Sequence, residues 1–138
     1  MSAPRVWLGT EGIVHVDYDA LSILTLAAVR TGFEMRRHLA PGRQLVMSRL
    51  PGIWRVDAEA AAFLSSQDVL RHTRAQAGVI DSSLGVSAVR ILEQHHPTPF
   101  PFRVFFTEQD ARDWLLGLEA GVGGSDAADE PPTLRTHW

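Results

Sequence analysis

Residues 77–96 read AGVIDSSLGVSAVRILEQHH and join a short apolar run to a longer segment with helical periodicity. The run up to residue 81 predicts a strand, because it is short, apolar and followed by a polar Asp-Ser-Ser turn. The segment from residue 82 predicts a helix. Its expected buried face holds Leu84, Ala88, Ile91 and Leu92, which recur at helical spacing. Strands that alternate with helices are typical of an α/β fold.

Two further β segments lie upstream. Residues 5–18 predict a hairpin, in which His15 alternates with Val14 and Val16 and should therefore point to the opposite face of the sheet. Residues 44–48 predict a short strand that ends at a Pro-Gly turn.

Two helices are predicted beside these strands. Residues 24–39 carry an apolar stripe, with Thr25 as the expected N-cap and Arg36 in the last turn, where positive charge suits the helix dipole. The alanine-rich segment after Asp57 predicts a second helix, which Asp57 should cap.

The remaining segments continue the alternation. Residues 67–76 predict a short helical piece, and residues 102–106 predict a strand. Residues 107–120 predict a helix capped by Thr107. Its expected buried face consists of Ala111, Trp114, Leu115 and Leu118.

The order of these elements predicts one α/β domain over residues 1–119. We expect a mixed sheet of about five strands, with four or five helices packed mainly on one face. Residues 120–138 lose periodicity and are rich in Gly, Asp, Glu and Pro, so we expect a flexible tail that ends at Trp138.

Composition narrows the classes of function. The 138 residues contain no cysteine, which excludes disulfides, thiol nucleophiles and cysteine-based metal sites. The net charge of −3 argues against a nucleic-acid partner. No apolar run approaches the ~20 residues of a membrane span, and no secretory signal is visible, so we expect a cytoplasmic protein. No motif calls for a cofactor.

Residues 77–92, followed by 99–115, resemble the closing part of a SpoIIAA-like domain, the fold of anti-anti-sigma factors and STAS domains. The resemblance is closest to an uncharacterised subgroup labelled STAS/SEC14-like. It covers residues 5–118, and the other matching segments are the hairpin 6–18, the helix 24–33 and the strand–loop–helix 45–64.

The resemblance bears on a phosphorylation switch. In phosphorylated anti-anti-sigma factors, an Asp-Ser pair lies where a central strand meets the second helix. By element count this position matches RVDAEAAAF, with Asp57 at the aspartate and Ala58 at the serine. Alanine has no hydroxyl, so the resemblance implies that the usual switch is absent. An alignment that uses Ser82 or Ser83 instead leaves too little chain for the remaining elements.

Asp81, Ser82 and Ser83 form the first candidate site. We expect them to cap the following helix, because their oxygens accept its unpaired N–H groups. The alternatives are an anion-binding helix N-terminus, a phosphorylation site or a serine nucleophile. A nucleophile would need an adjacent general base.

Trp54, Arg55 and Asp57 form the second candidate, a partner-binding loop. In the similar fold this loop lies on the face that contacts partners, and Trp and Arg are typical of interface hot spots. The alternative is that Ile53 and Val56 fill the core while Trp54 covers the sheet edge.

Two further expectations concern metals and self-association. His95 and His96 are adjacent on a helix and point about 100° apart, so we expect no metal site there. The face of the sheet away from the helices needs a cover, and Trp7, Val14 and Phe105 are candidates for a homodimer surface.

The resemblance implies a non-enzymatic protein-interaction or regulatory module with an unidentified protein partner. Two alternatives stay open. One is a binder of a small apolar or lipid-like ligand, which a sizeable apolar pocket would support. The other is a hydrolase-type enzyme that uses Ser82 or Ser83, which requires a histidine at about 3 Å from the hydroxyl.

Overall fold

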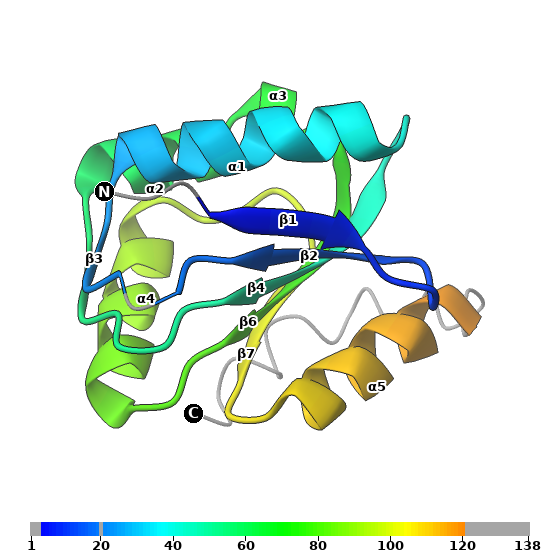
Figure 1. The fold of residues 1–138 in the computed structure, drawn as a ribbon. Coiled ribbons are helices and arrows are strands. Elements are labelled where there is room, and N and C mark those ends of the chain that lie inside the picture. Colours follow the sequence, from blue (N-terminus) through cyan, green and yellow to red (C-terminus); the bar gives the residue numbers. More distant parts are fainter. Residues whose placement is uncertain (1–3, 20, 121–138) are drawn as a thin grey trace.

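Figure 1 shows the fold; the computed structural model describes residues 4–19 and 21–120. The strands are β1 (Arg5–Leu8), β2 (Ile13–Asp17), β3 (Ile23–Leu24), β4 (Gln44–Arg49), β5 (Arg55–Val56), β6 (Thr73–Val79) and β7 (Phe102–Phe105). The helices are α1 (Leu26–Leu39), α2 (Ala58–Leu64), α3 (Gln67–Leu70), α4 (Ser83–His95) and α5 (Glu108–Ala120). Apart from Ala120, the predicted tail with Trp138 lies outside the described residues.

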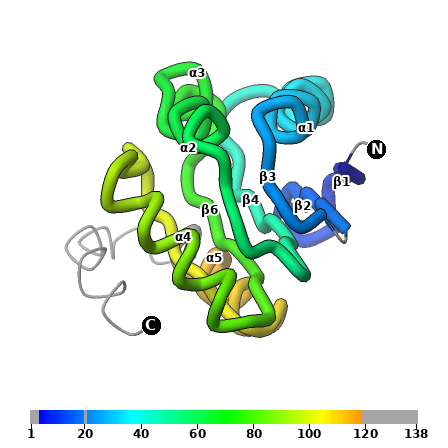
Figure 2. Tube along the Cα trace, turned by 90° about the vertical axis from the view of Figure 1, so that its left-hand side faces the viewer, coloured from blue at the N-terminus to red at the C-terminus, as the bar shows by residue number. Residues whose placement is uncertain are grey.

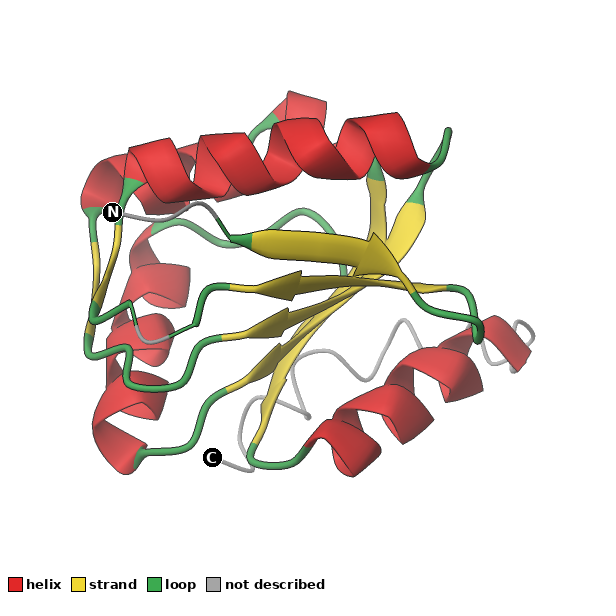
Figure 3. Cartoon of the chain, in the orientation of Figure 1, coloured by secondary structure: helices red, strands yellow, loops and turns green. Residues whose placement is uncertain are grey.

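A five-stranded mixed sheet forms the centre of the molecule, in the order β1-β2-β4-β6-β7. β1 pairs antiparallel with β2, whereas β2, β4, β6 and β7 pair in parallel. β3 and β5 form a separate two-stranded pair, visible at one end of the molecule in Figure 3. The α/β class and the mixed sheet predicted from the alternation of elements are confirmed.

Helices cover both faces of this sheet (Figures 1 and 2). α1, α2 and α4 pack on one face, where they share a core with the sheet. That core includes Val29, Ala60, Ile80, Val89 and Val104. α5 packs alone on the opposite face, where its core includes Ile13, Met47, Ala77, Ala111 and Leu115. The predicted buried face of α5 is confirmed.

The residues expected to form a homodimer surface do not share one face of the sheet, and α5 covers part of the face that was expected to be open. Val14 is buried on the face that packs against α1, α2 and α4, whereas Trp7 lies on the α5 face, opposite His15 in the β1–β2 register. Phe105 packs against Trp114 of α5, with ring centroids 5.7 Å apart. The three residues therefore do not form one surface, because alternate residues of a strand point to opposite faces.

The buried face of α4 differs from the predicted stripe. Leu84 and Ile91 are 62% and 58% exposed, whereas Val86 and Val89 are buried. The cause is close packing at Gly85, where an added Cβ would lie 2.7 Å from the backbone oxygen of Ile53. This tertiary contact sets which side of α4 faces the core, and the spacing of apolar residues alone could not reveal it.

The boundary between α3 and β6 also differs from the prediction. Helical structure ends at Leu70, and β6 begins at Thr73, within the segment predicted to be helical. The strand starts early because its first residues pair with β4. The Gln44 backbone N–H donates to the His72 carbonyl at 3.0 Å, and Thr73 lies opposite Gln44 in the parallel register. Among the helices of the described residues, none is long and apolar enough to cross a membrane.

Candidate functional site

The predicted partner-binding loop holds Trp54 at the surface. The neighbouring Ile53 fills the core, as the alternative interpretation of this loop predicted. The Trp54 backbone N–H donates to the Ser22 carbonyl at 2.9 Å, whereas the Trp54 side chain is 48% exposed. The backbone of the loop is thus anchored while its indole faces solvent.

Arg55 and Asp57 lie beside Trp54 as an ion pair, with Nε and Oδ1 3.4 Å apart. Asp57 occupies the N-cap position of α2, but its side chain accepts no cap hydrogen bond. Asp57 therefore stands at the predicted N-cap position, but the predicted hydrogen bond from its carboxylate to the helix is absent. Both side chains are partly exposed, so the pair adds little stability.

The candidate site at Asp81, Ser82 and Ser83 lies at the start of α4. The Ser82 hydroxyl oxygen accepts a hydrogen bond from the Gly85 N–H at 3.1 Å, which is the predicted capping contact. Asp81 accepts from the Gly52 N–H at 3.4 Å, and Ser83 is the exposed first residue of the helix. No hydrogen bond joins either serine to a histidine within residues 4–19 and 21–120.

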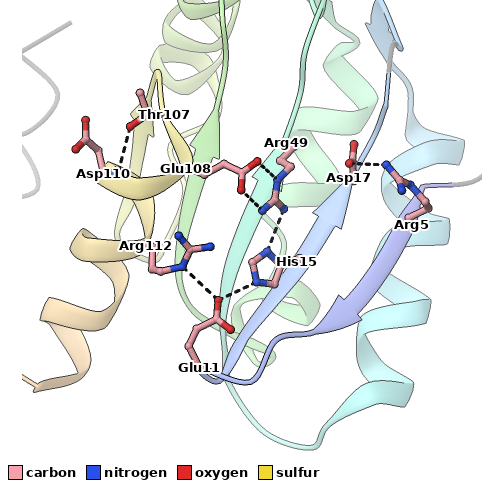
Figure 4. Close-up of polar contacts among 9 residues, drawn as sticks. All are labelled: Arg5, Glu11, His15, Asp17, Arg49, Thr107, Glu108, Asp110 and Arg112. Carbon is pink, nitrogen blue, oxygen red and sulfur yellow. Dashed lines mark hydrogen bonds and ion pairs between the residues drawn. The ribbon is translucent and has the colours of Figure 1, made fainter.

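A polar cluster that the sequence interpretation missed lies between the hairpin and α5 (Figure 4). We call Glu11, His15, Arg49, Glu108 and Arg112 the hairpin–α5 cluster. His15 is 3% exposed; its Nε2 lies 3.0 Å from Glu11, and its Nδ1 lies 3.0 Å from Arg49 Nη1. Arg49 donates two hydrogen bonds of 2.7 Å to Glu108, and Arg112 lies 3.5 Å from Glu11. The cluster joins β2, β4 and α5.

An aromatic ring covers the cluster. Trp7 stacks on His15 with an interplanar angle of 2° and ring centroids 5.0 Å apart. The guanidinium of Arg49 lies 5.4 Å from the Trp7 ring centroid, within the range of a cation–π contact. Trp7 therefore shields the imidazole from water on the exposed side of the hairpin.

The hydrogen bonds of His15 define its protonation. A guanidinium only donates, so Nδ1 of His15 accepts from Arg49 and Nε2–H donates to Glu11. The imidazole is therefore neutral. Burial lowers the pKa of His15, and the positive charge of Arg49 lowers it further, against the opposing effect of Glu11.

This arrangement fits a structural role. A general base needs a ring nitrogen that is free to take a proton from a substrate. Both nitrogens of His15 are already engaged, and Arg49 is held by Glu108 at two atoms. The cluster thus fastens the first turn of α5 to the sheet.

A cavity of about 80 Å³ lies between the sheet and the three helices on its other face. Apolar side chains dominate its walls, among them Val29 from α1, Val46 from β4, Leu64 from α2, Val89 from α4 and Phe102 from β7. A cavity of this volume has room for several waters or for a small organic molecule.

Arg36 brings a positive charge to the wall of this cavity. It is only 4% exposed, whereas the sequence predicted of it only a favourable charge in the last turn of α1. Burial lowers the pKa of Arg36 to about 10, so the guanidinium is still charged at neutral pH. A sequence signal existed: Val29, Phe33 and Arg36 recur at i, i+4 and i+7, which places them on one helix face.

Two polar side chains of the sheet also line the cavity. Ser48 is 3% exposed, and its hydroxyl makes no hydrogen bond within the described part of the chain. Gln76, on the neighbouring strand β6, lines the same cavity, and its side-chain amide has no such bond either. Ser48 is therefore a buried polar group without a protein partner, whereas Gln76 is half-buried, and both can hydrogen-bond to a molecule in the cavity.

Histidines and carboxylates do not form a metal centre in the described residues: no group of three or more His, Asp or Glu side chains is placed to hold an ion. Nδ1 of His95 lies 2.9 Å from the Ile91 carbonyl of its own helix.

Comparison with known proteins identifies a family for this chain, and the description of that family names no activity. No curated protein and no solved structure matches the chain. A family model matches residues 6–119, which include all the strands except Arg5 of β1 and nearly all of α5. The chain therefore belongs to the family described as Domain of unknown function (DUF7793).

Proposed function

We propose that this domain is a non-enzymatic binding protein for a small apolar molecule that carries a polar group. The observation that supports this function best is the cavity between the sheet and helices α1, α2 and α4. Its walls are mostly apolar, and a few polar side chains converge on it, which is the usual composition of a small-molecule site.

The size of the cavity limits the ligand. A volume of about 80 Å³ suits a small organic molecule, not a long lipid chain. The sequence left open a small apolar or lipid-like ligand. The volume of the cavity favours a ligand with a short chain.

Nuclear magnetic resonance of the valine methyl groups tests the proposal. Short-chain acids and amides are titrated, and the methyl signals of Val46 and Val89 are followed because both residues line the cavity. We expect saturable shifts with at least one compound. In the variant Ala61→Leu, which adds bulk to a cavity-lining position, the shifts should vanish.

The neighbouring substitution Ala62→Leu is the matched control, because Ala62 lies on the exposed side of the same helix. It should leave the shifts intact. Methyl signals that stay unchanged with every compound in the wild-type protein would refute a ligand-binding function for this cavity.

A second candidate function is a protein-interaction module, as the SpoIIAA/STAS resemblance implies. The anchored loop with its exposed Trp54 favours it, because a Trp held on a fixed backbone loses little entropy on binding. The missing hydroxyl at Ala58 means that such a module would act without the usual phosphoserine.

Site-specific photo-crosslinking in the source cells tests the interaction module. A photoreactive residue at Trp54 should give a discrete adduct, whereas one at the exposed Arg90 of α4 should not. An adduct of twice the protein mass would identify a homodimer. Equal labelling from both positions would contradict a specific partner surface at Trp54.

A further inference from the structure

We infer that the ligand of the cavity carries a carboxylate, which pairs with the guanidinium of Arg36. This inference rests on the proposed binding function and names the chemical class of the ligand.

Arg36, which lines the cavity, has donors that no described residue uses. Its Nε donates to the Gln44 side-chain oxygen at 2.9 Å, and its Nη2 donates to the His72 carbonyl at 2.7 Å and the Thr73 hydroxyl at 2.9 Å. Nη1 makes no hydrogen bond to any described residue. A guanidinium has five N–H groups, and both N–H groups of Nη1 are therefore available to a ligand.

The guanidinium of Arg36 also lacks an anionic side chain as partner among the described residues. The three acceptors that hold it are neutral, and no carboxylate within residues 4–19 and 21–120 forms an ion pair with it. The nearby Tyr18 is also neutral at pH 7, because burial raises its pKa to about 12. A buried charge without a counter-ion is costly. A carboxylate in the cavity would supply that counter-ion.

The remaining walls define the rest of the ligand. The Ser48 hydroxyl and the Gln76 amide are further hydrogen-bond donors on the sheet side of the cavity. Apolar side chains make up most of the other walls, which favours a hydrocarbon chain. Glu93 and His96 also line the cavity, and the carboxylate of Glu93 disfavours a second negative charge on the ligand. The site therefore fits a monocarboxylate with a short apolar chain.

Matched pairs of ligands separate this inference from the proposed function. Butyrate and butyramide have the same size and shape but differ in charge, and so do isobutyrate and isobutyramide. At pH 7 and constant ionic strength, methyl titrations should show that each acid binds at least roughly tenfold more tightly than its amide, because charge-assisted hydrogen bonds to Arg are the stronger ones.

The variant Arg36→Met removes the charge while keeping much of the side-chain volume. We expect it to abolish the preference for the acid over the amide. Should it fail to fold, the comparison of acid with amide in the wild-type protein decides by itself. Ser48→Ala, which leaves Arg36 in place, should retain the preference for the acid.

The outcomes discriminate between the two claims. If acid and amide bind equally to the wild-type cavity, the carboxylate inference is wrong and the binding function stands. If no acid and no amide shifts the methyl signals of the wild-type protein, both are wrong. Preference for the acid that persists in a folded Arg36→Met protein would also overturn the role of Arg36.

Discussion

At the scale of single residues, the imidazole of His15 is held between a carboxylate and a guanidinium, which contact opposite ring nitrogens. Protonation of Nδ1 would turn the hydrogen bond from Arg49 into a repulsive contact. The same burial that lowers the pKa of His15 therefore makes the folded state sensitive to acid.

We expect the free energy of unfolding to fall as the pH drops below about 6.5, the pKa of a histidine in the unfolded chain. The unfolded chain takes up the proton first, because the pKa of His15 is lower in the folded protein. The loss can reach about 1.4 kcal/mol per pH unit for one proton.

Urea denaturation of the wild type and of His15→Gln at pH 7.5, 6.5 and 5.5 measures this effect, since Gln does not titrate. The loss of stability between pH 6.5 and 5.5 should be smaller in the variant. Identical pH profiles would exclude His15 as the acid-sensitive group.

Ser82 gives a second prediction for a single residue. Its hydroxyl oxygen accepts the Gly85 N–H, so Ser82→Ala should cost about 1 kcal/mol of stability. Ser83→Ala is the matched control, because Ser83 is exposed and is not the cap residue. Its effect should stay within about 0.5 kcal/mol. Thermal unfolding of both variants compares them, and equal losses would argue against the cap.

At the scale of elements, the hairpin–α5 cluster determines how α5 meets the sheet. Arg49 on β4 reaches Glu108 in the first turn of α5 with two short hydrogen bonds. The pKa of Glu108 is lowered chiefly by these bonds to Arg49. The contact spans 59 residues of sequence, so only the folded chain brings its partners together.

Arg49→Met should therefore loosen α5. We expect a loss of about 2 kcal/mol, because Glu108 loses two hydrogen bonds from a charged donor and His15 loses one. Hydrogen exchange should accelerate most in α5. Arg5→Met is the control: Arg5 pairs with Asp17 at 2.8 Å, but its side chain is well exposed, so its removal should cost about 0–1 kcal/mol. Uniform acceleration of exchange over all elements would contradict a local role.

At the scale of the whole molecule, the sheet is a layer between two separate cores. α5 alone covers one of them, through Ala111 and Leu115 packed on Met47 and Ala77. The other core is shared among α1, α2 and α4, where the cavity lies. The proposed ligand would thus enter the layer of α1, α2 and α4 without contact to the core under α5.

Truncation after Phe106 tests this layering. Without α5, the apolar face around Ile13, Met47 and Ala77 would be exposed to water. We expect a chain of residues 1–106 to aggregate or to lose cooperative unfolding in calorimetry. A chain of residues 1–120 is the control, because it retains both cores. A soluble, cooperatively unfolding chain of residues 1–106 would show that α5 is dispensable.

The candidate site was predictable only in part. The Ser82 cap and the exposure of Trp54 follow from local residue types, because Ser is a favoured cap and Trp54 stands beside a Pro-Gly turn. The hairpin–α5 cluster and the cavity were missed. Their members, such as His15 and Glu108 or Arg36 and Ser48, come from segments far apart in the chain.

The sequence by itself determined the local elements: hydrophobic periodicity and capping residues located most helices and strands, the mixed α/β sheet and the face to which His15 points. Tertiary structure decided what the periodicity leaves open. The contact between Gly85 and Ile53 determines which side of α4 is buried. Pairing with β4 places the start of β6 at Thr73. Packing of α5 covers the second face of the sheet. These outcomes depend on long-range packing, which no local pattern encodes.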